Sequence, residues 1–89
     1  MNPAQQEMFD RAILNVLDAK RTRFGLTLEE IRFGLPAHGF PVQEADAVIY
    51  RLDYLELKGH VAEVVKETHR ANRAWRITDM GITWLDERS

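Results

Sequence analysis

The chain contains no cysteine among its 89 residues. Disulfide frameworks and thiolate metal sites are therefore excluded, and this composition fits a reducing compartment. No apolar run approaches the roughly 20 residues that a membrane-spanning helix needs. The first ten residues do not place an apolar stretch after a basic one, so we expect no signal peptide. We expect a cytoplasmic protein that has no membrane partner.

An excess of charge of either sign is also missing. Twelve Lys and Arg residues stand against fourteen Asp and Glu residues, which gives a net charge of −2 and a pI near 5.9. Such a balance argues against a polycation that grips phosphate over its whole surface, but it permits a local basic patch. The length suits one small domain, which we place over 1–89.

Signatures of catalysis and of cofactor binding are absent too. The three histidines, His38, His60 and His69, fall on a loop, a helix–strand junction and a turn, and no pair has the spacing of metal ligands. We find no glycine-rich phosphate loop and no nucleophile elbow. The sequence therefore predicts a binding protein with no catalytic site, no metal and no cofactor.

What the chain does contain is apolar residues at helical spacing. Asn2 and Pro3 can begin a helix over 3–20. Thr27 and Glu30 have the spacing of a capping box for a short helix over 28–34. The predicted core positions of these helices are Phe9, Ala12, Ile13, Val16, Leu17, Leu28, Ile31 and Leu35. Leu26, just before the second helix, can pair as a strand residue.

A loop and a third helix follow. Two prolines and two glycines in "GLPAHGFP" predict a loop, because they oppose a continuing helix. The third helix is predicted over 42–58 and ends at Gly59. Its core side holds Ala45, Val48, Leu52 and Leu55.

The last third of the chain reads as a hairpin and a short helix. "HVAEVVKE" and "RAWRIT" favour two strands, which gives a hairpin over about 60–78. Trp75 on the second strand is expected to lie in the core rather than to present its ring to a ligand. Thr78 can cap a final helix that buries Leu85. The predicted order is helix, helix, helix, strand, strand, helix, an α+β fold that is mostly α.

Two segments in this order resemble a known family. "LDYLELKGHV" resembles the end of a recognition helix that runs into a hairpin wing. "WRITDMGITWL" resembles the strand-to-helix junction of MarR-like and PadR-like regulators, through Trp75, Ile77, Thr78 and Gly81. The resemblance covers about 5–87 and implies a winged helix-turn-helix domain: a three-helix core, a β-hairpin wing and a short C-terminal helix. It further implies a prokaryotic transcriptional regulator that places its third helix in the major groove of duplex DNA.

On that expectation the DNA-binding residues are Gln43, Tyr50, Arg51, Lys66, Arg70, Asn72 and Arg73. Gln43 can read adenine, Tyr50 can donate to phosphate and Arg51 can reach phosphate from the flank. The last four of these, from Lys66 to Arg73, are predicted to clamp the DNA backbone. Lys20, Arg21 and Arg23 can contact the same DNA backbone beside the second helix, or can simply complement the dipole at a helix end.

The charge of the third helix keeps a second function open. Asp46 and Asp53 lie on its predicted outward face, where a polyanion would repel them. Tyrosine is enriched at protein interfaces, and the same face therefore suits a protein–protein interaction module or a homodimer. The alternative interface comprises Asp46, Ala47, Tyr50, Asp53, Tyr54 and Leu57. Met8, Leu14 and Trp84 on the terminal helices can either form a dimer seam or complete the core.

Overall fold

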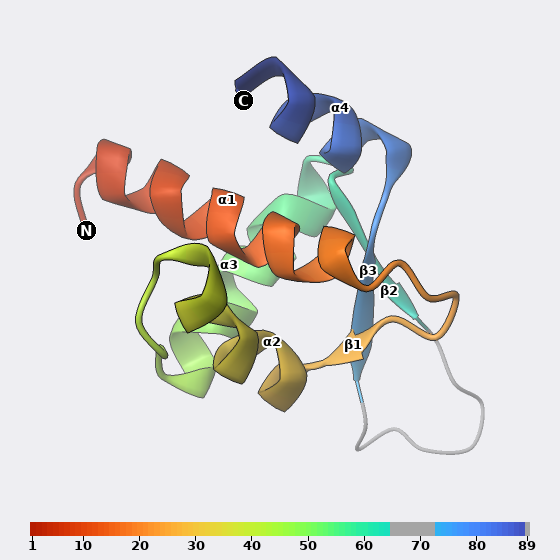
Figure 1. The fold of residues 1–89 in the computed structure, drawn as a ribbon, viewed down its shortest axis with the longest axis horizontal. Coiled ribbons are helices and arrows are strands. Elements are labelled where there is room, and N and C mark those ends of the chain that lie inside the picture. The colour runs from red at the N-terminus through yellow and green to blue at the C-terminus, as the bar shows by residue number, and fades with distance from the viewer. Residues whose placement is uncertain (65–72, 89) are drawn as a thin grey trace.

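The computed structural model describes residues 1–64 and 73–88. It is an α+β arrangement, mostly helical, with a small three-stranded antiparallel sheet (Figure 1). The elements in chain order are α1 (Pro3–Ala19), β1 (Leu26–Thr27), α2 (Leu28–Gly34), the 3-10 helix η1 (Leu35–His38), α3 (Ala45–Leu57), β2 (Val61–Val64), β3 (Ala74–Ile77) and α4 (Asp79–Arg88). The predicted order of helices and strands is confirmed.

Local capping explains where α1 and α2 begin. The Asn2 side chain accepts a hydrogen bond from the Gln5 amide at 2.8 Å, and the Gln5 side chain accepts one from the Asn2 amide. Thr27 and Glu30 form the predicted capping box of α2 in the same reciprocal way. Helix α1 ends at Ala19, one residue earlier than predicted.

The segment between α2 and α3 differs from prediction. A 3-10 turn over Leu35–His38 continues directly from α2, where a loop was predicted, and it ends at Gly39 with a φ of +80°. Leu35 is fully buried, and proline suits the first turn of such a helix. The chain then runs without regular structure to Glu44, so α3 begins at Ala45 rather than at 42.

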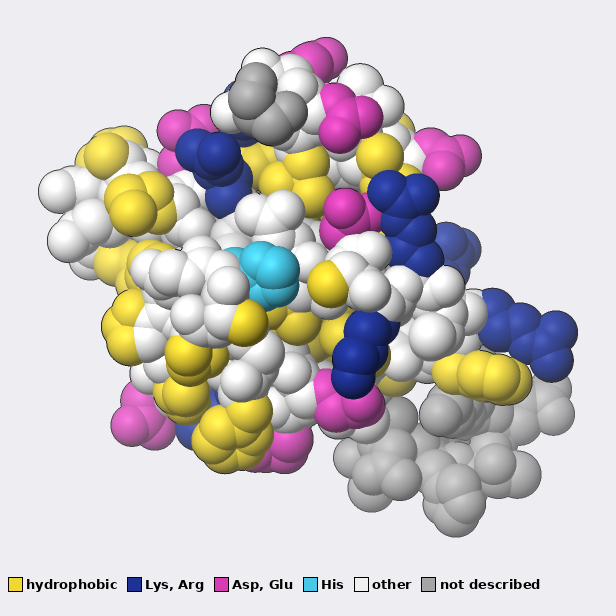
Figure 2. All heavy atoms as spheres, in the orientation of Figure 1, with side chains coloured by type: hydrophobic (Ala, Val, Ile, Leu, Met, Phe, Trp, Pro, Cys, Tyr) yellow, Lys and Arg dark blue, Asp and Glu magenta, His cyan; other side chains and the backbone are white. Residues whose placement is uncertain are grey.

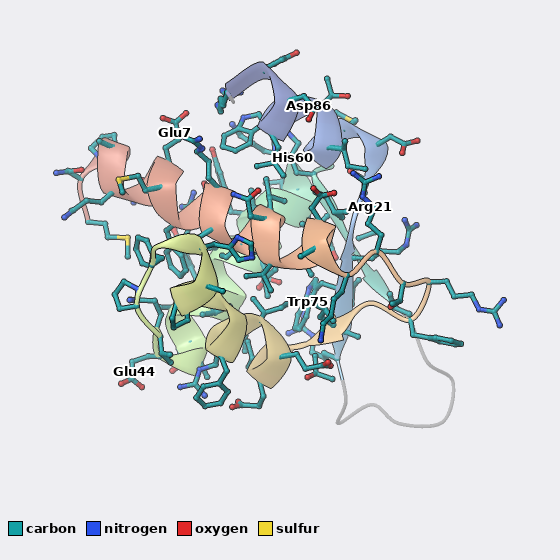
Figure 3. All side chains as sticks on the ribbon, viewed as in Figure 1. Glu7, Arg21, Glu44, His60, Trp75 and Asp86 are labelled. Carbon is teal, nitrogen blue, oxygen red and sulfur yellow. The ribbon has the colours of Figure 1, made fainter. Side chains whose placement is uncertain are left out.

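The sheet has the order β1–β3–β2, with β3 in the centre. Leu26 pairs with Trp75, which confirms the predicted strand residue, and Val61 pairs with Ile77. Trp75 is fully buried, as predicted, and lies between the sheet and the helices (Figure 3). The hairpin strands therefore supply part of the core.

A tight junction joins the hairpin to α4. The Thr78 hydroxyl donates to the Gly59 carbonyl at 2.6 Å and accepts from the Gly81 amide at 3.1 Å. The Thr78 amide donates to the His60 carbonyl. A Cβ on Gly81 would lie 2.3 Å from that carbonyl oxygen, so only glycine fits here. Thr78 thus caps α4, as predicted, and also ties it to the end of α3.

The core lies where α1 crosses α2 and α3 and meets the sheet (Figure 1). Its fully buried side chains include Phe9, Ile13, Leu14, Leu17, Ile31, Leu35, Val48, Leu52, Leu55 and Trp75. Leu14 is therefore a core residue, whereas Met8 is 56% exposed and Trp84 is half-buried.

Among the described residues, no helix combines the length and the apolar character that crossing a membrane requires.

Candidate nucleic-acid interface

The outward face of α3 carries an exposed stripe, which we call the α3 ridge: Asp46, Tyr50, Asp53, Tyr54 and Leu57. The spacing of three to four residues places them along one side of the helix. Leu57 is 87% exposed, Tyr50 71% and Tyr54 37%. Asp46 and Asp53 are also exposed. Leu57, Tyr50 and Tyr54 form the apolar and aromatic part of this ridge, and Asp46 and Asp53 are its acidic members.

Arg51 does not face outward, contrary to its predicted role on DNA. Its Nε donates to one carboxylate oxygen of Asp10 at 2.8 Å, and its second terminal nitrogen donates to the other at 2.6 Å. The two side chains are only 11% and 9% exposed. The hydrogen bond from Arg51 to Asp10 raises the pKa of Arg51 above its ordinary value, although burial opposes the rise. The cation is therefore held between α3 and α1 and is not available to phosphate.

Gln43 also departs from its predicted position. It precedes α3 instead of lying on its first turn. Its carbonyl accepts a hydrogen bond from Arg32 Nε at 2.8 Å, and its side-chain amide donates to the Pro41 carbonyl. These two bonds hold Gln43 in the connection, and they explain why the helix starts later than the apolar pattern suggested.

Ala47 is the third correction on this helix. It is partly buried and packs against the core, so it does not belong to the outward strip. Tyr50 keeps the exposed position predicted for it. Of the three groove-facing residues expected from the sequence, Tyr50 alone lies on the α3 ridge.

In the described part of the hairpin, the Arg73 side chain is also less available to DNA than expected. Arg73 pairs with Glu63 through Nε at 2.5 Å, lies 3.5 Å from Asp53 and stacks over the Trp75 ring. The hydrogen bond to Glu63 raises the pKa of Arg73. Arg73 is thus neutralised by two carboxylates in this conformation. The other predicted wing residues, Lys66, Arg70 and Asn72, lie outside the described residues.

Cations gather instead at the end of α1. A surface hollow there is rimmed by Lys20, Arg21, Arg23 and Arg76, with Ile77 and Ile82 in its floor. We call it the cationic hollow. Lys and Arg side chains, in dark blue, are prominent on the right-hand part of the view in Figure 2. Arg21 lies beside the start of α4 (Figure 3).

The charge of the cationic hollow is only partly compensated. Asp79 also lines it, and Arg21 pairs with Asp18. Lys20, Arg23 and Arg76 make no salt bridge within 1–64 and 73–88. The "KRTR" cations were predicted from the sequence, whereas Arg76 was not predicted to be their neighbour. The pairing of β3 with β1 brings Arg76 beside them.

A second hollow lies between α1, α3 and α4. Asp10, Arg51, His60, Trp84 and Arg88 contribute to its walls. His60 lies between α1 and α4 (Figure 3), and its ring centroid is 5.7 Å from that of Trp84. Burial lowers the pKa of His60, and nearby cations lower it further. The arginines here are already paired with Asp10 and Glu7. Lys58 also lines this hollow and has no salt bridge in the described residues.

Within the described residues, no group of three or more His, Cys, Asp or Glu side chains is placed to hold a metal ion.

Comparison with models of known protein families gives no match, and comparison with curated protein sequences gives none either.

Proposed function

We propose that the chain is a winged-helix domain that binds duplex DNA mainly through the phosphate backbone. The cationic hollow is the observation that carries this proposal. Lys20, Arg23 and Arg76 are exposed there and make no ion pair in the described residues. Cations in such a cluster release counterions from DNA when they bind phosphate, which supplies sequence-independent affinity.

The arrangement of elements supports the winged-helix assignment. Three helices precede a hairpin, and a short strand before α2 joins the hairpin in the order β1–β3–β2. The cationic hollow borders β3, the second strand of the hairpin. In the sequence, Lys66 and Arg70 fall between the two strands of the hairpin, and they lie outside the described residues.

Reading of base edges by α3 is a minor part of this proposal. Its arginine is bound by Asp10, and two of the five ridge residues are acids. A carboxylate near DNA is repelled unless it accepts a hydrogen bond from cytosine. We therefore expect binding that is salt-sensitive and has little sequence preference.

Fluorescence anisotropy with a labelled random-sequence duplex tests the proposal. The full chain is titrated at about 50 and about 200 mM salt, because the slope of affinity against salt reports the number of phosphates neutralised. The test variant is Arg23→Ala with Arg76→Ala. The control is Arg11→Ala with Lys58→Ala, which removes the same charge outside the hollow.

The test variant should bind roughly 10- to 100-fold more weakly at about 50 mM salt on every duplex, and its salt slope should fall by about two phosphate contacts. The control should lose much less affinity. Equal affinities for the two double variants would show that the hollow is not the contact. No binding by the unaltered chain at about 50 mM salt would reject DNA binding itself.

A further inference from the structure

The α3 ridge needs an explanation that DNA binding does not provide. Leu57 and Tyr50 are among the most exposed large apolar or aromatic side chains of the described residues. They lie seven positions apart, two helical turns, so they share one side of α3. Isolated exposed apolar residues are common, but a stripe of apolar and aromatic residues with polar neighbours is typical of an interaction surface.

The charge of the ridge is set by contacts elsewhere in the fold. Arg51 is bound by Asp10 and lies over the Tyr54 ring, and Arg73 is shared between Asp53 and Glu63. Asp46 has no salt bridge in the described residues. A partner for this face should therefore offer cations to Asp46 and an apolar surface to Leu57 and Tyr50.

The chain itself carries such a surface. The cationic hollow has four Lys and Arg side chains at its rim and isoleucines in its floor. Phe24, the residue after Arg23, is 57% exposed, and Arg23 stacks over its ring. The hollow is formed by the end of α1, β3 and the start of α4, so one copy can offer its ridge and its hollow at the same time.

We propose that copies of this chain associate head to tail, with the α3 ridge of one copy seated in the cationic hollow of the next. Leu57 and Tyr50 would cover Ile82, which is more exposed than Ile77, while Asp46 would meet the cations of the rim. A symmetric ridge-to-ridge dimer is disfavoured, because both faces of that interface would carry Asp46 and Asp53 and concentrate like charges there. A head-to-tail contact leaves one free surface at each end, so assembly continues into chains or rings.

The proposed contact between the ridge and the hollow is small. Stable interfaces bury about 800 Å² on each partner from some 20 to 30 residues, and a single helical stripe offers much less. Association should therefore be weak, dependent on concentration and reduced by salt, because opposite charges at an exposed rim are screened.

Sedimentation velocity on the full chain without DNA measures this association. The average mass should rise above that of one chain with concentration at about 50 mM salt and should fall at about 500 mM. A chain that stays monomeric at every concentration and at low salt would overturn the proposal. Because DNA is absent, this result does not depend on whether the DNA-binding proposal succeeds.

Two variants, each with one of the two surfaces blocked, give the sharper test. Leu57→Arg blocks the ridge, and Arg76→Glu blocks the hollow; both residues are exposed. Met8→Arg and Arg11→Glu on α1 are matched controls that should associate like the unaltered chain. Circular dichroism checks that all four variants remain folded.

Each blocked variant alone should be monomeric. Their equimolar mixture should form a species of two chains and nothing larger, because each supplies one intact surface and one blocked end. A mixture that stays monomeric would contradict the proposal. Association of Arg76→Glu alone would point to the symmetric ridge-to-ridge dimer and would also overturn it.

Discussion

The guanidinium of Arg51 donates to both carboxylate oxygens of Asp10, a residue 41 positions earlier in the chain. The pair joins α3 to α1 and is largely buried. It also removes the arginine of α3 from the surface that a DNA groove would meet. A single long-range contact thus changes the interpretation of the helix, because it leaves Asp46 and Asp53 on the outward face without that cation.

Replacement of Asp10 by Ala should destabilise the protein strongly. The change leaves the Arg51 guanidinium buried without its partner, and removal of one member of a buried ion pair costs about 3–5 kcal/mol. Urea denaturation followed by circular dichroism measures the free energy of unfolding. A loss below about 1 kcal/mol would mean that Arg51 readily finds solvent and is not fixed by Asp10.

The double variant Asp10→Leu with Arg51→Met serves as the control. It replaces both charges by apolar side chains, which is often neutral relative to a buried pair. We expect it to recover most of the stability that Asp10→Ala loses. If it is as unstable as the single variant, packing at this position matters more than charge compensation.

Base reading by α3 should be slight. On the proposed backbone mode of binding, Gln43→Ala and Tyr50→Ala should change duplex affinity by less than about threefold, since Gln43 is held by Arg32 and Pro41 and a good base contact is worth about 1–3 kcal/mol. Anisotropy titrations on several duplex sequences provide the measurement. A tenfold loss on one sequence but not on others would restore α3 as a reading helix.

Much of the fold could be predicted because its signals are local. The capping box of Thr27 and Glu30, the strand residue Leu26 and the cap at Thr78 all follow from residue types a few positions apart. The burial of Trp75 follows from an apolar strand pattern. These features need no knowledge of distant contacts.

The candidate site was harder to predict, because tertiary contacts decide it. Helical spacing alone put Arg51 on an accessible flank, whereas its direction is set by Asp10 on another helix. The start of α3 shifted because Arg32 binds the Gln43 carbonyl. Arg76 joined the "KRTR" cations only through strand pairing. A sequence window that covers one element contains none of this information.

Gly81→Ala should destabilise the protein by about 1–3 kcal/mol, the usual cost of overpacking. The new Cβ would lie 2.3 Å from the His60 carbonyl oxygen and 2.8 Å from Ile77 Cγ1. The backbone of the junction must therefore shift, and the bonds made by Thr78 would weaken with it. Thermal unfolding by circular dichroism detects the change as a lower Tm.

Gly39→Ala is the comparison that separates overpacking from backbone strain. No atom lies within 4 Å of a Cβ built there, and the cost comes only from its φ of +80°. A left-handed conformation costs a residue with a side chain about 1–2 kcal/mol. If Gly81→Ala left Tm unchanged while Gly39→Ala lowered it, the tight approach of α4 to the His60 carbonyl would be incorrect.

Stability should fall as the pH drops through the range where His60 titrates. Burial is the main cause of its lowered pKa; Lys58 and Arg88 lower it further, and Asp10 opposes them. Because the folded-state pKa lies below the unfolded value of about 6.5, the unfolded chain binds more protons. The stabilisation is therefore complete above about pH 6.5, decreases below it, and levels off below the folded-state pKa.

Urea denaturation between about pH 7.5 and about pH 5 tests this dependence in His60→Gln and, as a control, in His38→Gln at an exposed position. Carboxylates also titrate near the acid end of this range, so the comparison between variants carries the result. His60→Gln should show a smaller loss of unfolding free energy on acidification than the unaltered chain, whereas His38→Gln should keep the full loss. Equal losses in all three proteins would show that the imidazole of His60 titrates as it does in the unfolded chain.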